Sequence, residues 1–149
     1  MREYKFRGKR VDNGEWVYGY YGELTDGETT KSYIMTNTVS FGSVTNVYFT
    51  DHEVDPETVG QFTGICDKNC VDIYEKDILS CPTWWWGNCF VYLDTGSCGP
   101  CDDDSVMGYI LAKNIDNPLL DASYNICNGD DVEAIGNTID NPEILEGER

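Results

Sequence analysis

Apolar and polar residues alternate with a period of two along most of the chain, which is typical of half-buried β-strands. At the start, Tyr4 and Phe6 alternate with charged residues, residues 12–14 supply Asp, Asn and Gly, and the aromatic residues of 16–20 alternate again. Two alternating runs around such a turn predict a β-hairpin.

Similar short runs recur further along the chain and are separated by polar or Gly-containing segments. Pro56 favours an extended residue before it and could open a single helical turn. Helical spacing is limited to residues 117–126 and 141–148, both short. The further predicted strands are 32–36, 46–51, 61–65, 71–79, 88–94, 106–115 and 132–140, and 25–31 and 37–43 are predicted turns or loops.

This succession of short strands predicts a mainly β protein with few or no long helices. Its form would be a small, strongly curved β-barrel or a pair of packed sheets. At 149 residues the chain is long enough to bury a core without disulfide or metal support, so we expect one domain over residues 1–149.

Charge separates the N-terminus from the rest of the chain. The chain has 10 basic and 27 acidic residues, a net charge of −17, and five of the ten basic residues lie within residues 1–10. A body with this field repels a phosphate backbone, so we expect no direct binding to nucleic acid. The same field attracts basic protein surfaces, although acidity can also serve solubility alone.

The chain shows no recognisable targeting signal, and we expect it to reside in the reducing cytosol. We expect no membrane association, because no run approaches the length of a membrane span and the basic N-terminus leads into no apolar core. The seven cysteines cannot all pair within the chain. In a reducing compartment thiols stay free or bind metal.

Three blocks of the sequence resemble the N-terminal, central and C-terminal signatures of the YopX family of bacteriophage and prophage proteins. They are MREYKFRGKRVDNGEWVYGYY (1–21), VDPETVGQFTGICDKNCVDIYEKDIL (54–79) and VEAIGNTIDNPEIL (132–145). The resemblance implies a phage-encoded, mainly β protein of small-barrel type, and it implies no activity.

The chain departs from the family pattern at three positions of the central block. Cys70 stands where the family usually has Gly in Asp-Lys-Asn-Gly, Lys76 replaces Gly in Tyr-Glu-Gly-Asp, and Cys66 replaces a polar residue. Residues of about 80–131 match no family signature, and we interpret them as a divergent insertion rich in Cys, Trp and Asp.

Cysteine pairs could hold a structural zinc ion. Cys66 and Cys70 form one pair and Cys98 and Cys101 another, and two close pairs on separate turns are a common zinc arrangement. The alternative is a set of buried or idle thiols. A redox role for Cys98 and Cys101 is disfavoured because three aspartates follow, and negative charge disfavours the thiolate.

The predicted contact patch combines tryptophans with aspartates. Three successive rings cannot all face one side of a strand, so we expect at least one to be exposed or to cover a loop, and exposed Trp is a favoured anchor for a partner. The alternative is that the rings fold against one end of a barrel. Nearby carboxylates would add long-range attraction. The predicted partner-binding residues are Trp84, Trp85, Trp86, Asp102, Asp103, Asp104, Asp130 and Asp131.

No catalytic constellation is recognisable: His52 is the only histidine, and neither a nucleophile elbow nor a phosphate-binding loop occurs. We therefore expect a non-enzymatic accessory protein that binds and inhibits a bacterial host protein. A nuclease is a plausible target, since an acidic surface can occupy its basic groove as a nucleic-acid mimic, in the manner of an anti-CRISPR protein. The alternatives are a β-barrel module that sequesters a nucleotide or other small ligand, and a zinc-stabilised or thiol-active protein.

Overall fold

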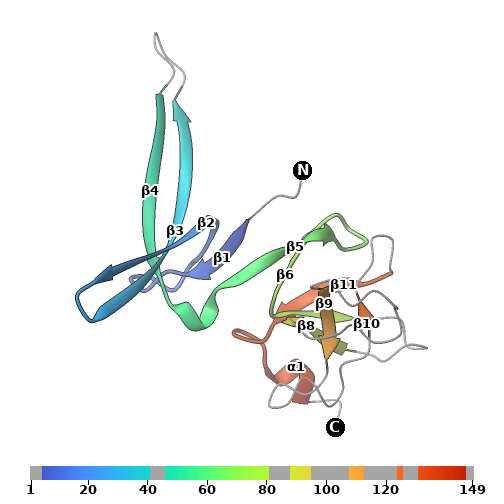
Figure 1. The fold of residues 1–149 in the computed structure, drawn as a ribbon. Coiled ribbons are helices and arrows are strands. Elements are labelled where there is room, and N and C mark those ends of the chain that lie inside the picture. The colour runs from blue at the N-terminus through green and yellow to red at the C-terminus, as the bar shows by residue number, and fades with distance from the viewer. Residues whose placement is uncertain are drawn as a thin grey trace. The chain divides into compact units, whose positions relative to one another are not determined.

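The computed structural model describes residues 5–40, 46–80, 88–94, 108–112, 124–125 and 131–146. These residues are mainly β, as predicted, and their two helices are short (Figure 1). No helix among them is long and apolar enough to span a membrane. The chain divides into two compact units, Met1–Phe62 and Thr63–Arg149, and β5 crosses the boundary between them.

The first unit is built from an antiparallel meander. Its strands follow the order β4-β3-β2-β1-β5 in the six-stranded sheet, which β6 completes. The elements are β1 (Phe6–Lys9), β2 (Trp16–Asp26), β3 (Thr29–Ser40), β4 (Asn46–Val54), the 3₁₀-helix η1 (Pro56–Thr58) and β5 (Gly60–Cys66).

The predicted hairpin at the N-terminus is confirmed. Phe6 pairs with Gly19 and Lys9 with Trp16, and Gly14 has φ +72°, a left-handed conformation that glycine adopts without strain. The predicted helical turn at Pro56 is also present: it is η1, which the Asp55 carboxylate caps by accepting from the Glu57 N–H.

Strands β2, β3 and β4 are longer than the sequence pattern predicts. The turn predicted within segment 25–31 is present at Gly27, which has φ +62°, but it is tight, and β2 and β3 pair as far as Asp26 and Thr29 on either side of it. Likewise β3 continues to Ser40 through residues expected to be a loop. Thr and Val in these segments have high β-propensity, and cross-strand pairing outweighs their local polarity.

A small core lies on one face of the first unit. Ile34 and Val54 are almost completely buried, and the rings of Phe6 and Tyr21 are 5.5 Å apart. The Tyr21 hydroxyl lies 3.1 Å from the Ser32 hydroxyl. These residues come from β1 to β4, so the meander holds together through one shared face.

The second unit contains an antiparallel five-stranded sheet in the order β10-β9-β8-β7-β11. The divergent insertion contributes three of its strands, β8, β9 and β10. The elements of this unit are β6 (Asp72–Tyr74), β7 (Asp77–Ser80), β8 (Asn88–Asp94), β9 (Gly108–Ala112), β10 (Tyr124–Asn125), β11 (Glu133–Asn137) and α1 (Glu143–Glu146).

Residues 71–79 were predicted as one strand, but they form two, β6 and β7. A turn at Glu75 and Lys76 separates them, and Lys76 has φ +71°, which interrupts an extended backbone. Strand β7 is buried on both faces. Leu79 packs with Ile73, Val91 and Val132, while Ile78 packs with residues of α1.

The barrel form of the fold prediction is not confirmed. The described strands form two open antiparallel sheets. A single bridge between Arg10 and Val54 brings the end of β1 to β4, and this bridge does not extend into a ladder.

Candidate functional site

The most unusual surface of the first unit is a two-stranded arm, formed by residues 36–40 of β3 and 46–50 of β4 (Figure 1). Strand β2 pairs with β3 only up to Tyr20 and Met35, and then pairs with β1. The bend lies at Gly19, where a Cβ atom would be 2.1 Å from the Met35 carbonyl oxygen. Glycine therefore lets β2 turn away, and the arm continues without a third strand among the described residues.

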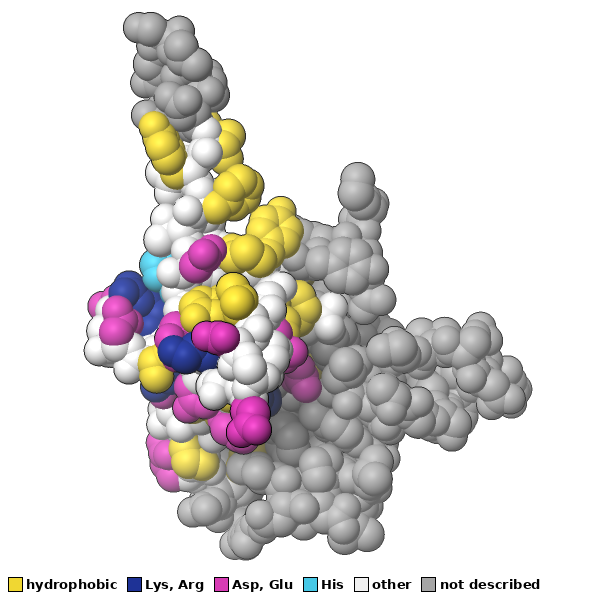
Figure 2. Space-filling model, turned by 60° about the vertical axis from the view of Figure 1, so that its left-hand side comes forward, with side chains coloured by type: hydrophobic (Ala, Val, Ile, Leu, Met, Phe, Trp, Pro, Cys, Tyr) yellow, Lys and Arg dark blue, Asp and Glu magenta, His cyan; other side chains and the backbone are white. Residues whose placement is uncertain are grey.

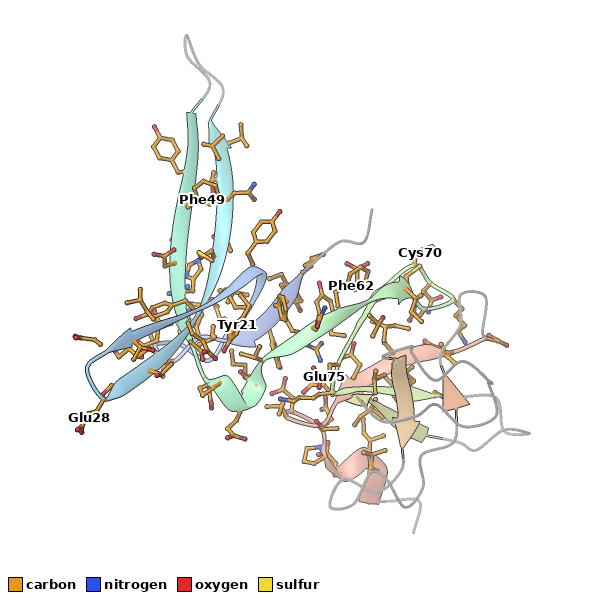
Figure 3. The ribbon with its side chains drawn as sticks, viewed as in Figure 1. Tyr21, Glu28, Phe49, Phe62, Cys70 and Glu75 are labelled. Carbon is orange, nitrogen blue, oxygen red and sulfur yellow. The ribbon has the colours of Figure 1, made fainter. Side chains whose placement is uncertain are left out.

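Large apolar side chains on the arm are exposed on both of its faces. Val39 pairs with Val47, and Asn37 with Phe49, so these four side chains share one face. Tyr48 lies on the other face. Phe49 is 67% exposed, Tyr48 56%, Val47 52% and Val39 42%. Figure 2 shows hydrophobic side chains following one another along the arm, and Figure 3 shows Phe49 projecting from it.

The face that carries Phe49 continues onto β2. Met35 of β3 pairs with Asp51 of β4 on one side and with Tyr20 of β2 on the other. Alternation places Tyr20 on the same face as Phe49, and Tyr18 lies on that face two residues earlier in β2. Tyr18 and Tyr20 are 47% and 56% exposed. The first unit thus presents a row of exposed aromatic residues rather than isolated apolar side chains, which is the arrangement associated with interaction surfaces.

Charged side chains are missing from this part of the sequence. Residues 32–50, which include the whole arm, contain no Asp, Glu, Lys, Arg or His, in a chain whose charged residues make up 25%. The arm is therefore apolar and uncharged, while the remainder of the chain is acidic. This surface was not predicted from the sequence, and the charge-free run with its β-branched and aromatic residues is the signal from which it could have been predicted.

Basic residues of β1 lie on aromatic rings. The Lys5 ammonium is 5.8 Å from the centroid of Phe62, and the Trp16 ring has the Arg7 guanidinium at 4.8 Å and the Lys9 ammonium at 5.6 Å. Arg7 is only 6% exposed. Three cations therefore line one strand face together with two rings, each cation held by the negative face of a π-system.

The turn between β5 and β6 is organised by the buried carboxylate of Asp67. Its Oδ1 accepts from the N–H groups of Asn69 at 2.8 Å and Val71 at 2.9 Å, and its Oδ2 accepts from the Ala134 N–H at 3.0 Å. Burial favours the protonated acid, but donation from Val71, Ala134 and Asn69 outweighs it and holds the pKa of Asp67 below the ordinary value. This turn is a structural element.

Cys66 and Cys70 stand on either side of that turn as free, exposed thiols. Desolvation raises the pKa of Cys66, and the neighbouring Cys70 thiol and the carboxylates of Asp72 and Asp67 raise it further. A raised pKa disfavours the thiolate, so Cys66 lacks the activation of a nucleophilic cysteine.

Only some of the predicted site residues lie in the part of the chain that the structure describes. Asp131 is exposed at the start of the segment leading into β11, close to Lys68, which forms a 2.7 Å ion pair with Glu133. The described residues contain no group of three or more potential metal ligands. The other predicted residues, Trp84, Trp85, Trp86, Asp102, Asp103, Asp104, Asp130, Cys98 and Cys101, lie outside the described residues, so the tryptophan patch and the zinc site stay predictions.

Comparison with known proteins identifies the family of the chain and a solved structure of similar fold. The chain superposes on the crystal structure of protein EF1440 from Enterococcus faecalis with a TM-score of 0.50 and 19% identity, over 97% of this chain and 99% of that one. At this identity the likeness concerns the fold alone. A search of curated proteins found no match. The model of the family described as YopX protein matches residues 5–146, nearly the whole length, and the chain therefore belongs to the YopX family.

Proposed function

We propose that this chain is a phage-encoded, non-enzymatic binding protein that inhibits a basic protein of the bacterial host, in the host cytoplasm. The distribution of charge supports this proposal. The first unit, Met1–Phe62, contains 6 basic and 10 acidic residues, a net of −4, whereas Thr63–Arg149 contains 4 basic and 17 acidic residues, a net of −13. The acidity of the chain is thus concentrated in one unit.

The second unit exposes carboxylates on a firmly built framework. Asp131, Asp140 and Glu143 are exposed, and they flank or follow β11, which is paired with the buried strand β7. Carboxylates on such a framework produce a field that attracts a basic groove and competes there with nucleic acid. An anti-defence inhibitor that occupies the nucleic-acid channel of a host nuclease requires such an acidic surface.

Affinity capture from host lysate, followed by mass spectrometry, would identify the target. We expect a basic, nucleic-acid-handling protein whose binding weakens steeply as salt rises. The double variant Asp131→Asn, Glu143→Gln should bind that target about tenfold more weakly, given the usual energies of exposed ion pairs.

A matched control is Asp26→Asn, Glu28→Gln, which removes the same charge from an exposed turn of the first unit (Figure 3). An equal loss of affinity in both variants would mean that only the net charge of the chain matters. Binding whose affinity does not change with salt concentration would contradict the proposal of a nucleic-acid mimic.

A second candidate function is sequestration of a nucleotide or similar anionic ligand. The observation in its favour is the convergence of Lys5, Arg7 and Lys9 with Trp16 and Phe62 on one face. Phosphate would bind the ammonium groups of Lys5 and Lys9, and a base would stack on a ring. Thermal-shift screening with nucleotides tests it: we expect a rise in Tm that Trp16→Leu abolishes, and no shift with any nucleotide would exclude this function.

A further inference from the structure

We propose that the arm is a self-association surface, on which β4 of one copy pairs antiparallel with β4 of a second copy. The result would be a continuous four-stranded ribbon, β3-β4 of one chain followed by β4-β3 of the other. This inference concerns the first unit and does not depend on the host protein proposed as the partner of the acidic second unit.

Strand β4 is an edge strand whose outer side is covered at one end only. Near its C-terminal end, the Val11 N–H donates to the Glu53 carbonyl at 3.1 Å, Arg10 bridges Val54, and the Asp55 N–H donates to the Lys9 carbonyl at 2.9 Å. Along residues 46–50, the described part of the chain supplies no strand on that side. The backbone groups of this edge are therefore available to another strand.

The edge lacks the devices that keep strands apart. Proteins commonly protect an edge with Lys, Pro, a bulge or an inward charge. Residues 46–50 are Asn, Val, Tyr, Phe and Thr, and β3 and β4 pair in continuous register from Ser32 and Val54 to Ser40 and Asn46. A two-stranded ribbon with both faces in water is only marginally stable, and further strands on its edge stabilise it.

Charge indicates that the occupant is a second copy. Two chains of charge −17 repel each other, and residues 32–50 are the longest run without a charged side chain. This arm is therefore where two copies can meet without placing like charges together. A basic or nucleic-acid partner would find no opposite charge on the arm.

A two-fold register centred on Tyr48 gives favourable pairs. It sets Tyr48 opposite Tyr48 of the second copy and Val47 opposite its Phe49, which are aromatic and aromatic–β-branched cross-strand pairs. Asn46 then faces Thr50. Because only a short strand segment takes part, we expect weak association, with a Kd of about 10 μM.

Sedimentation equilibrium of the full chain over a range from about tenfold below to tenfold above that Kd tests the proposal. We expect a monomer–dimer equilibrium that Phe49→Lys weakens at least tenfold. Leu24→Lys is the matched control, because Leu24 is 63% exposed on β2 and lies outside the arm. That variant should dimerise as the wild type does.

Hydrogen exchange of the wild-type chain adds a test that needs no variant. Amides of residues 46–50 should exchange more slowly as the concentration rises. High salt should strengthen the dimer, because it screens the repulsion between two negatively charged chains. The same salt should weaken binding to the basic host protein. The two proposals can therefore fail separately.

Three results would overturn the proposal: a monomer at every concentration, a dimer that Phe49→Lys leaves intact, or a dimer without concentration-dependent protection of residues 46–50. A monomer whose binding to a host protein is lost in Phe49→Lys would assign the arm to that protein instead.

Discussion

The two units of the chain place their apolar side chains differently. Eight of the ten large apolar side chains that are exposed in the described residues belong to the first unit, among them Tyr20, Leu24 and Phe49. In the second unit Ile73, Ile78, Leu79, Val91 and Val132 are buried almost completely.

The difference follows from how many faces of each strand are covered. Strand β7 lies between two neighbours in its sheet, and it has the Ile73 cluster against one face and Leu145 of α1 against the other. The arm has neither a third strand nor a covering layer among the described residues. The same strand-forming residue types therefore stabilise one unit internally and leave the other with a surface for association.

The substitution Gly19→Ala should have the largest effect and should act on the first unit. Its Cβ would lie 2.1 Å from the Met35 carbonyl oxygen, a backbone atom that cannot move away easily. We expect a loss of about 3 kcal/mol, measured by denaturant unfolding and localised by hydrogen exchange. Gly22→Ala is the matched control, because its Cβ would contact only the flexible end of Met35, at 3.2 Å. Equal effects would mean that the bend of β2 does not depend on Gly19.

The substitution Asp67→Ala should act on the second unit. It removes the acceptor for three backbone N–H groups, including that of Ala134, which lies 67 residues away in the sequence. We expect a loss of about 2 kcal/mol, with faster amide exchange in β11 and unchanged exchange in β2 and β3. Faster amide exchange in both units would contradict the conclusion that their cores are separate.

Acid should weaken the contribution of Asp67. Since its pKa is lower in the folded state than in the unfolded state, its stabilisation is complete above the unfolded value, about 3.9, and is lost as the pH falls through the folded value. In unfolding curves from pH 6 to pH 2, the difference between wild type and Asp67→Asn should shrink as the pH falls. A constant difference would exclude a role for the ionised carboxylate.

The smallest effects are expected at the two family glycine positions. Cys70 and Lys76 have φ values of +62° and +71°, where a side chain is strained. Cys70→Gly and Lys76→Gly should each stabilise the second unit by about 1 kcal/mol in thermal or denaturant unfolding. Glu75→Gly, at a neighbouring position without positive φ, should destabilise it.

Local patterns in the sequence predicted the elements that depend on local pairing. The N-terminal hairpin, the turn at Pro56 and the mainly β class agree with the structure, because turn residues and alternation act over a few positions. The resemblance to the YopX family located Cys70 and Lys76 as substituted glycines, and their left-handed backbone explains why glycine is favoured there.

The candidate site could not be predicted from the alternation of apolar and polar residues. Segment 25–31 was expected to be a turn or loop, and its turn at Gly27 is present, but β2 and β3 extend to either side of it. Segment 37–43 was expected to be a loop because it is polar and contains Gly, yet β3 extends into it. A polar strand is stable when its neighbour pairs with it, and the register of that neighbour is a tertiary property. The arm was missed for this reason.

By itself, the sequence determined the period of the strands, the position of the turns at 12–14 and within 25–31, the acidity and the charge-free run. The tertiary structure decided which face of each strand is buried, and which distant segments pair, such as Arg7 with Gly60 and Leu79 with Ala134. Alternation defines two faces and leaves open which one is covered, because burial is set by whatever packs against the strand.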